Sequence, residues 1–246
     1  MELSDYFILF SSAFLGGSLI FLIKNNLTKK LKLLLSFSGA YLFSITVLHL
    51  LPEVYASNNS YVGLFILLGF SFQIFLEHFS EGIEHGHIHA HSHPQNLFPW
   101  GIMLSLSLHA FLEGMPLVDF GTGNNNHNHT GHTLLYGIAL HHIPAAFALT
   151  SVLYQNKVNK KMVIFLLIVF ALMTPFGSLF SGFLQSNSIG IISNYFQYIM
   201  GVVIGIFLHI STTILFESNV DHRFNVYKMI AIIIGAGLAV LNFLLS

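Results

Sequence analysis

Apolar residues in this chain are gathered into long runs, and short polar connections separate one run from the next. A helix needs about 20 mostly apolar residues to cross the roughly 30 Å hydrocarbon layer of a membrane. Eight segments meet this requirement: 6–23, 33–52, 61–79, 97–118, 133–154, 161–184, 191–216 and 226–245. Because the connections are short, the pattern predicts an all-α membrane protein in which residues 1–246 form a single domain of eight transmembrane helices.

Composition agrees with this class of protein. Hydrophobic residues make up 54% of the chain and charged residues only 8%. So few ionised side chains cannot cover the surface of a soluble globule, and we expect the lipid bilayer as the surrounding medium. The nine Lys and Arg residues do not build the basic face that nucleic acid requires, so no nucleic-acid partner is expected. The chain has no Cys, which excludes thiolate metal sites.

The basic residues predict the orientation of the bundle. If the eight segments alternate in direction, all the Lys and Arg residues fall on one face of the membrane: Lys24, Lys29, Lys30, Lys32, Lys157, Lys160, Lys161, Arg223 and Lys228. The positive-inside rule makes that face cytoplasmic. We therefore expect both termini outside, the His-rich loop 80–96 in the cytoplasm, and the protein in the cell (inner) membrane.

Ionisable side chains are costly in hydrocarbon and are candidates for a functional site, and two neighbouring apolar segments concentrate them. His109 and Glu113 are four residues apart in the fourth segment and share one helix face. His141 and His142 lie in the fifth segment, and His141 is expected at the same depth as His109, near the bilayer centre. Imidazole and carboxylate together suit Zn²⁺, Fe²⁺, Mn²⁺, Cd²⁺ or another divalent ion, and the alternative is a hydrogen-bonded structural cluster.

Prolines interrupt the same two segments. Pro116 and Pro144 are expected to release the carbonyls of Leu112 and Leu140, beside the candidate ligands. Such carbonyls could line a cavity or contact an ion. For Pro175, in the sixth segment, a kink that serves packing is the preferred interpretation.

Other histidines and acids suggest a path on either side of this site. His49 and His209 could line the path or make helix-to-helix hydrogen bonds. Glu77 and His78, at the inner end of the third segment, are candidate exit ligands on this path. The loop 80–96 contains five alternating histidines: His85, His87, His89, His91 and His93. Such a tract is typical of a metal-binding segment, with a flexible linker as the alternative. Gly201 and Gly205 permit close helix contact within one chain or in a homodimer.

At these residues the chain resembles the ZRT/IRT-like (ZIP) family of divalent metal transporters. Residues 39–53 read GAYLFSITVLHLLPE, residues 109–114 read HAFLEG and residues 141–146 read HHIPAA. The family patterns are H-N-x-x-D/E-G and H-x-x-P-E-G. The resemblance implies a 3+2+3 bundle with an inverted repeat, and transport of zinc or a similar ion into the cytoplasm between the fourth and fifth helices. The ion is then a substrate, and no prosthetic group is expected.

The chain departs from the family patterns at two positions. Ala110 replaces the Asn of the first motif, and Ala145 replaces the Glu of the second. In family members with a two-metal centre these positions help to hold the second ion. A second site is therefore expected to be weak or absent here, with His142 as a partial replacement that need not share the ion bound by His141, because adjacent helical residues point about 100° apart.

Other functions are less well supported by the sequence. A membrane-embedded metal-dependent hydrolase would also place His and carboxylate at mid-depth, but the chain contains no H-E-x-x-H motif. A bis-histidine haem protein would leave Glu113 without a role. No nucleotide-binding G-x-x-x-x-G-K-S/T loop is present, so we expect transport by alternating access without ATP, and not enzymatic activity.

Overall fold

Long helices account for almost all of the structure that the computed structural model describes, and no strand occurs in this part of the chain. The described residues are 1–22, 27–56, 60–80, 82, 99–118, 128–187, 192–216 and 226–245. The helices are α1 (Leu3–Ser18), α2 (Leu27–Ile45), α3 (Leu51–Tyr55), α4 (Val62–Ser80), α5 (Trp100–Gly114), α6 (Asn128–Gln155), α7 (Lys160–Asn187), α8 (Ile192–Phe216) and α9 (Val226–Leu245).

Short segments of different helical geometry extend three of these elements. A 3-10 turn at Leu19–Phe21 continues α1, and a second one at Met115–Leu117 continues α5. A π-helical segment, Thr46–Leu50, joins α2 to α3, so the predicted second segment is one continuous helical rod. The π-helical geometry is rare and is often found at functional positions.

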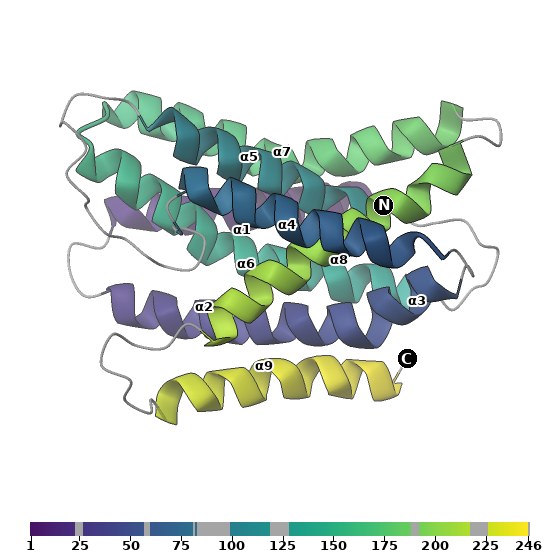
Figure 1. The fold of residues 1–246 in the computed structure, drawn as a ribbon. Coiled ribbons are helices and arrows are strands. Elements are labelled where there is room, and N and C mark those ends of the chain that lie inside the picture. Colours follow the sequence, from purple (N-terminus) through teal and green to yellow (C-terminus); the bar gives the residue numbers. More distant parts are fainter. Residues whose placement is uncertain are drawn as a thin grey trace.

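The helices confirm an all-α membrane protein. Within the described residues, seven helical stretches are long and apolar enough to cross a membrane. The fourth predicted segment, 97–118, is not among them, because α5 has only 15 residues before the chain tightens ahead of Pro116. Eight spans therefore stay a prediction. Both termini lie at the same end of the bundle, as an even number of crossings requires (Figure 1).

The helices pack as two groups. In the first group α1 contacts α6 and α7, and α7 contacts α5; in the second, α4 packs on α8, and α2 packs on α8 and α9. The groups meet mainly where α2 contacts α6 and where α4 contacts α5. In Figure 1, α5 and α7 lie along one side of the bundle, and α9 lies at the opposite edge beside α2.

This pairing agrees with the expected inverted repeat. An inverted repeat relates the first three predicted spans to the last three in the same order, so α1 corresponds to α7, α2 to α8 and α4 to α9. The two central helices, α5 and α6, correspond to each other. The α1–α6 contact then becomes the α7–α5 contact, and the α4–α8 contact becomes the α9–α2 contact. All four pairs are among the most extensive helix contacts in the described part of the chain.

Glycine lets the paired helices approach at backbone distance. A Cβ atom added to Gly205 of α8 would lie 2.0 Å from the carbonyl oxygen of Ile66 on α4, far inside ordinary contact. At Gly201 the nearest atom would be the Cβ of Phe65, at 3.0 Å. These two glycines therefore serve a contact within one chain. Assembly of two copies stays a prediction.

Candidate metal centre

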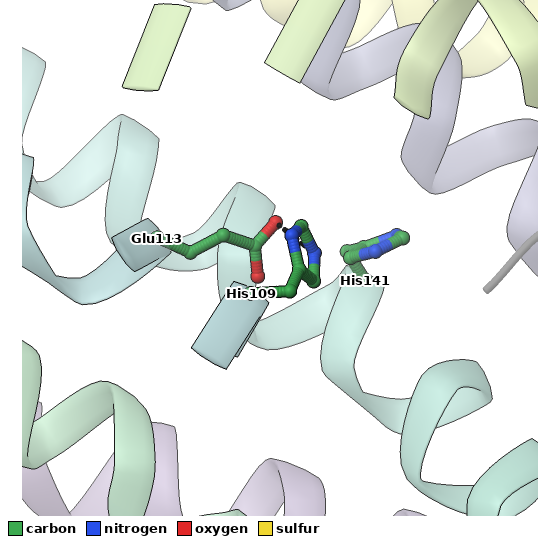
Figure 2. A group of neighbouring side chains, drawn as sticks. All are labelled: His109, Glu113 and His141. Atoms are coloured by element: carbon green, nitrogen blue, oxygen red, sulfur yellow. Dashed lines mark ion pairs between the residues drawn. The ribbon is translucent and has the colours of Figure 1, made fainter. Parts of the chain in front are cut away.

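Three buried side chains converge between α5 and α6. His109, Glu113 and His141 each offer one ligand atom, and these atoms all lie within 4.8 Å of one another. The exposed fractions of the three residues are 3%, 0% and 0%. Figure 2 shows the Glu113 carboxylate directed toward the His109 ring, with the His141 ring on the other side of His109.

Helix geometry explains why the sequence brings these groups together. His109 and Glu113 are one turn apart on α5, so their side chains share a face, and His109 Nε2 lies 3.1 Å from Glu113 Oε1. His141 comes from the neighbouring helix, and its ring is nearly perpendicular to that of His109, with centroids 6.2 Å apart. The prediction that α5 and α6 bring these residues to the same depth agrees with this contact.

The spacing suits a divalent ion. Zinc binds imidazole nitrogen and carboxylate oxygen at about 2.0–2.2 Å, so tetrahedral ligands are separated by about 3.4 Å. The present maximum of 4.8 Å requires the ligand atoms to converge by only about 1.5 Å, within the reach of side-chain rotation. Glu113 Oε1 makes no well-aligned hydrogen bond with any described residue, although it is fully buried. A buried carboxylate oxygen of this kind is a good cation ligand.

His142 contacts the other oxygen of the same carboxylate. Its Nε2 lies 2.7 Å from Glu113 Oε2, and the residue is only 2% exposed. It does not belong to the three-residue group whose ligand atoms converge. The two adjacent histidines of α6 therefore approach different parts of the site, as their angular separation on a helix predicts.

A hydroxyl on α7 completes the surroundings of His142. Thr174 Oγ1 donates to the carbonyl oxygen of Ala110 at 2.9 Å and lies 3.4 Å from His142 Nδ1. The sequence interpretation did not single out Thr174. The signal that could have revealed it is its place in the sequence: Thr174 is a polar residue directly before Pro175, in an otherwise apolar part of its helix.

Apolar residues enclose the site. Ala110 and Ala145, the two positions that depart from the family motifs, are both buried in a cluster that also contains Leu106 and Phe170. Glu113 is the only acidic residue in the segments 97–118 and 133–154. The described surroundings therefore combine one negative charge with low polarity, which strengthens electrostatic interactions.

The expectation for the proline-released carbonyls is wrong at Leu112. The chain tightens into a 3-10 turn at Met115–Leu117, and the N–H of Met115 donates to the carbonyl oxygen of Leu112. That oxygen therefore has a partner although Pro116 has no N–H. Pro144 lies inside the continuous helix α6, and release of the Leu140 carbonyl stays a prediction.

The candidate path residues occupy separate positions. His49 lies in the π-helical segment, partly buried, with its ring edge-on to Phe243 of α9 at 5.2 Å between centroids. His209 Nε2 of α8 pairs with Glu77 Oε2 of α4 at 2.6 Å. His78 is exposed. None of them belongs to the three-residue group, and the loop histidines at 85, 87, 89, 91 and 93 lie outside the described residues.

Together, the membrane-spanning helices and the buried His-Glu-His group define an integral membrane protein with a candidate metal site inside its bundle. Comparison with protein families identifies it further. Residues 80–242 match the model of the ZIP zinc transporter family, and the chain belongs to this family. The match includes α5 and α6 with all three converging residues. It supports transport of metal ions, with a divalent ion as substrate. A search of curated proteins gives no match.

Proposed function

We propose that this protein transports divalent metal ions, with zinc preferred, across the cell membrane into the cytoplasm through a site formed by His109, Glu113 and His141. The observation that carries the proposal is the convergence of these three ligand atoms within 4.8 Å, at fully or almost fully buried positions between two central helices. The ion is the transported substrate and not a resident cofactor.

The charge of the site supports a cation as its occupant. A carboxylate removed from water is costly unless a positive charge or hydrogen bonds compensate it. Glu113 is 0% exposed and is the single acidic residue of its segment. A divalent ion at Oε1 would supply that compensation, and the imidazoles of His109 and His141 would complete a ligand set typical of zinc.

Three protein ligands also favour an ion that can exchange. Structural zinc sites are closed by four protein ligands, whereas sites with three leave a position for water. An ion held in this way can lose its last water molecules on entry and regain them on release. Protons compete with the metal for the same imidazoles and carboxylate, so binding displaces any proton that these ligands carry.

The packing of the helices supports alternating access. His109, Glu113 and His141 all belong to one of the two helix groups, the one that contains α1, α5, α6 and α7. Movement of this group against the other would change which side of the membrane the site faces without separating its ligands. The nine Lys and Arg residues, all expected on one face, favour a cytoplasmic position for that face by the positive-inside rule.

Uptake into liposomes tests the proposal. Purified protein would be reconstituted, and entry of Zn²⁺, Fe²⁺, Mn²⁺ and Cd²⁺ measured with an internal dye, with Mg²⁺ as an ion that prefers oxygen ligands. We expect zinc to enter fastest, and both Glu113→Gln and His109→Ala to reduce entry to the rate of empty liposomes.

A matched control separates the site from general damage. Glu2→Gln makes the same chemical change at an exposed residue that caps α1, and it should transport like the wild type. Accumulation of metal in cells that express the protein tests the direction. Wild-type uptake by both site variants would refute the proposed site, and absence of uptake of every ion by the wild-type protein would refute the proposed function.

A further inference from the structure

The two oxygens of Glu113 have different partners. Oε1 faces His109 Nε2 at 3.1 Å, and both residues belong to the group whose ligand atoms converge. Oε2 lies 2.7 Å from His142 Nε2, in a contact where both residues are almost completely buried. An ionised carboxylate has no proton to donate, so the His142 Nε2–H donates and Oε2 accepts.

We propose that His142 is a positioning residue that holds Glu113 Oε2 and lies where a second ion would otherwise bind, so that the carboxylate binds one ion through Oε1 alone. This inference rests on the proposed function, because it describes how the same site limits its occupancy. It assigns His142 a role different from that of a metal ligand.

The hydrogen bond itself prevents His142 from binding the ion through Nε2. A ring nitrogen that donates to a carboxylate carries a proton and has no lone pair for a metal. Thr174 Oγ1 of α7 lies 3.4 Å from the other ring nitrogen, Nδ1, and 3.5 Å from Nε2. The His142 ring also lies 6.0 Å from that of Phe170, another residue of α7. The His142 ring therefore lies between the Glu113 carboxylate of α5 and two residues of α7.

The groups around Oε2 offer little to a second cation. The Thr174 hydroxyl donates its proton to the Ala110 carbonyl, and Ala110 and Ala145 contribute only methyl groups to an apolar cluster. Two divalent ions a few Å apart need bridging carboxylates to offset their repulsion in a poorly solvated site. On α5 and α6 the sequence provides Glu113 alone. The hydrogen bond from His142 to Oε2 compensates the loss of water around this carboxylate oxygen, so that no second ion is required there.

The test uses two replacements that are isosteric with each other. In His142→Gln the amide Nε2–H lies close to the place of the imidazole Nε2–H and can still donate to Oε2, whereas in His142→Glu the donor is replaced by a second carboxylate. Both are made in the full-length chain with the five histidines of loop 80–96 changed to serine, which removes their contribution to zinc binding. Zinc per protein is measured by equilibrium dialysis, and X-ray absorption at one equivalent of zinc counts the imidazole ligands.

We expect one zinc ion with two imidazole ligands in the unsubstituted protein. His142→Gln should keep one zinc ion and two imidazole ligands and weaken binding by about 10- to 100-fold or less, the usual effect of changing a group that orients a ligand. His142→Glu should bind two zinc ions. Three imidazoles that fall to two in His142→Gln would overturn the proposal and make His142 a ligand. A single ion bound by a folded His142→Glu variant would also overturn it.

The same samples keep this inference separate from the proposed function. Three imidazoles in a protein that transports zinc would refute only the role of His142. Two imidazoles in a protein that moves no ion would refute transport and leave the role of His142 intact. The imidazole count of the protein with native His142 does not depend on any variant at that position folding correctly.

Discussion

Gly177 lies where the backbones of α7 and α5 approach closely, and its replacement by alanine should disturb the metal site without changing a ligand. A Cβ atom at this position would lie 1.9 Å from the carbonyl oxygen of Phe111 on α5. Ordinary contact begins at 3.4 Å, so the two helices must separate by about 1.5 Å. Backbone atoms cannot rotate away as a flexible side chain can.

This displacement reaches the site through the helices themselves. α5 carries His109 and Glu113, and α7 carries Thr174 one turn before Gly177. The hydrogen bond from Thr174 Oγ1 to the Ala110 carbonyl, now 2.9 Å, would lengthen beyond bonding distance. Overpacking costs about 1–3 kcal/mol and a lost hydrogen bond about 1 kcal/mol, while alanine gains about 1 kcal/mol of helix propensity over glycine. The net destabilisation is about 2 kcal/mol.

Thermal unfolding in detergent and zinc affinity measure the two effects. For a chain of this size about 2 kcal/mol corresponds to a decrease in Tm of about 4–8 °C, compared at one scan rate because membrane proteins often unfold irreversibly. Displacement of α5 should weaken zinc binding by about 10- to 100-fold, as for other changes that misorient a ligand.

Two glycine replacements serve as controls for the Gly177→Ala experiment. At Gly182, also on α7, the nearest atom to an added Cβ is Val118 Cγ2 at 3.7 Å, and at Gly237 on α9 nothing lies within 4 Å. Both variants should unfold at or slightly above the wild-type Tm, because alanine favours the helix and meets no obstacle. If Gly177→Ala matched these controls in Tm and zinc affinity, the inferred backbone contact between α5 and α7 would be refuted.

Three further changes test other parts of the protein. Ala145→Glu should restore the carboxylate of the H-x-x-P-E-G motif and raise the zinc stoichiometry measured by calorimetry, while Ala145→Gln should not; equal stoichiometry in both would contradict the charge argument. Deletion of 85–93 should leave initial zinc uptake unchanged and alter its response to metal accumulated in the cytoplasm, so loss of initial uptake by a folded deletion variant would show another role. Gly205→Ala should lower the Tm in detergent by separating α8 from α4, because its Cβ would lie 2.0 Å from the Ile66 carbonyl oxygen; an unchanged Tm would argue against this contact.

Hydropathy predicted where each helix lies in the sequence more accurately than it predicted the residues at which the helix begins and ends. The predicted fifth segment began at residue 133, whereas α6 begins at Asn128, and the second began at residue 33, whereas α2 begins at Leu27. In both cases the added residues are mainly polar. A hydropathy pattern reports which residues suit hydrocarbon, whereas a helix continues as long as its backbone hydrogen bonds do.

The core of the candidate site was accessible from the sequence because it depends on local geometry. The four-residue spacing places His109 and Glu113 on one face of α5 whatever surrounds that helix. His141 follows from depth, since α5 and α6 are consecutive and antiparallel. The hydrogen bonding of the carbonyls four residues before the prolines was less predictable. The chain can form a 3-10 turn ahead of a proline, and here the Leu112 carbonyl accepts the Met115 N–H.

The sequence by itself determined that this is a helical membrane protein and that His109, Glu113 and His141 form its candidate site. Only the tertiary structure decided which oxygen of Glu113 each histidine contacts and that Thr174 on α7 lies beside His142. The physical reason is the range of the interactions. Hydropathy and helical periodicity act within one segment, whereas the rotation of α7 against α5 depends on where Gly177 lets two backbones meet, and that contact joins residues far apart in the chain.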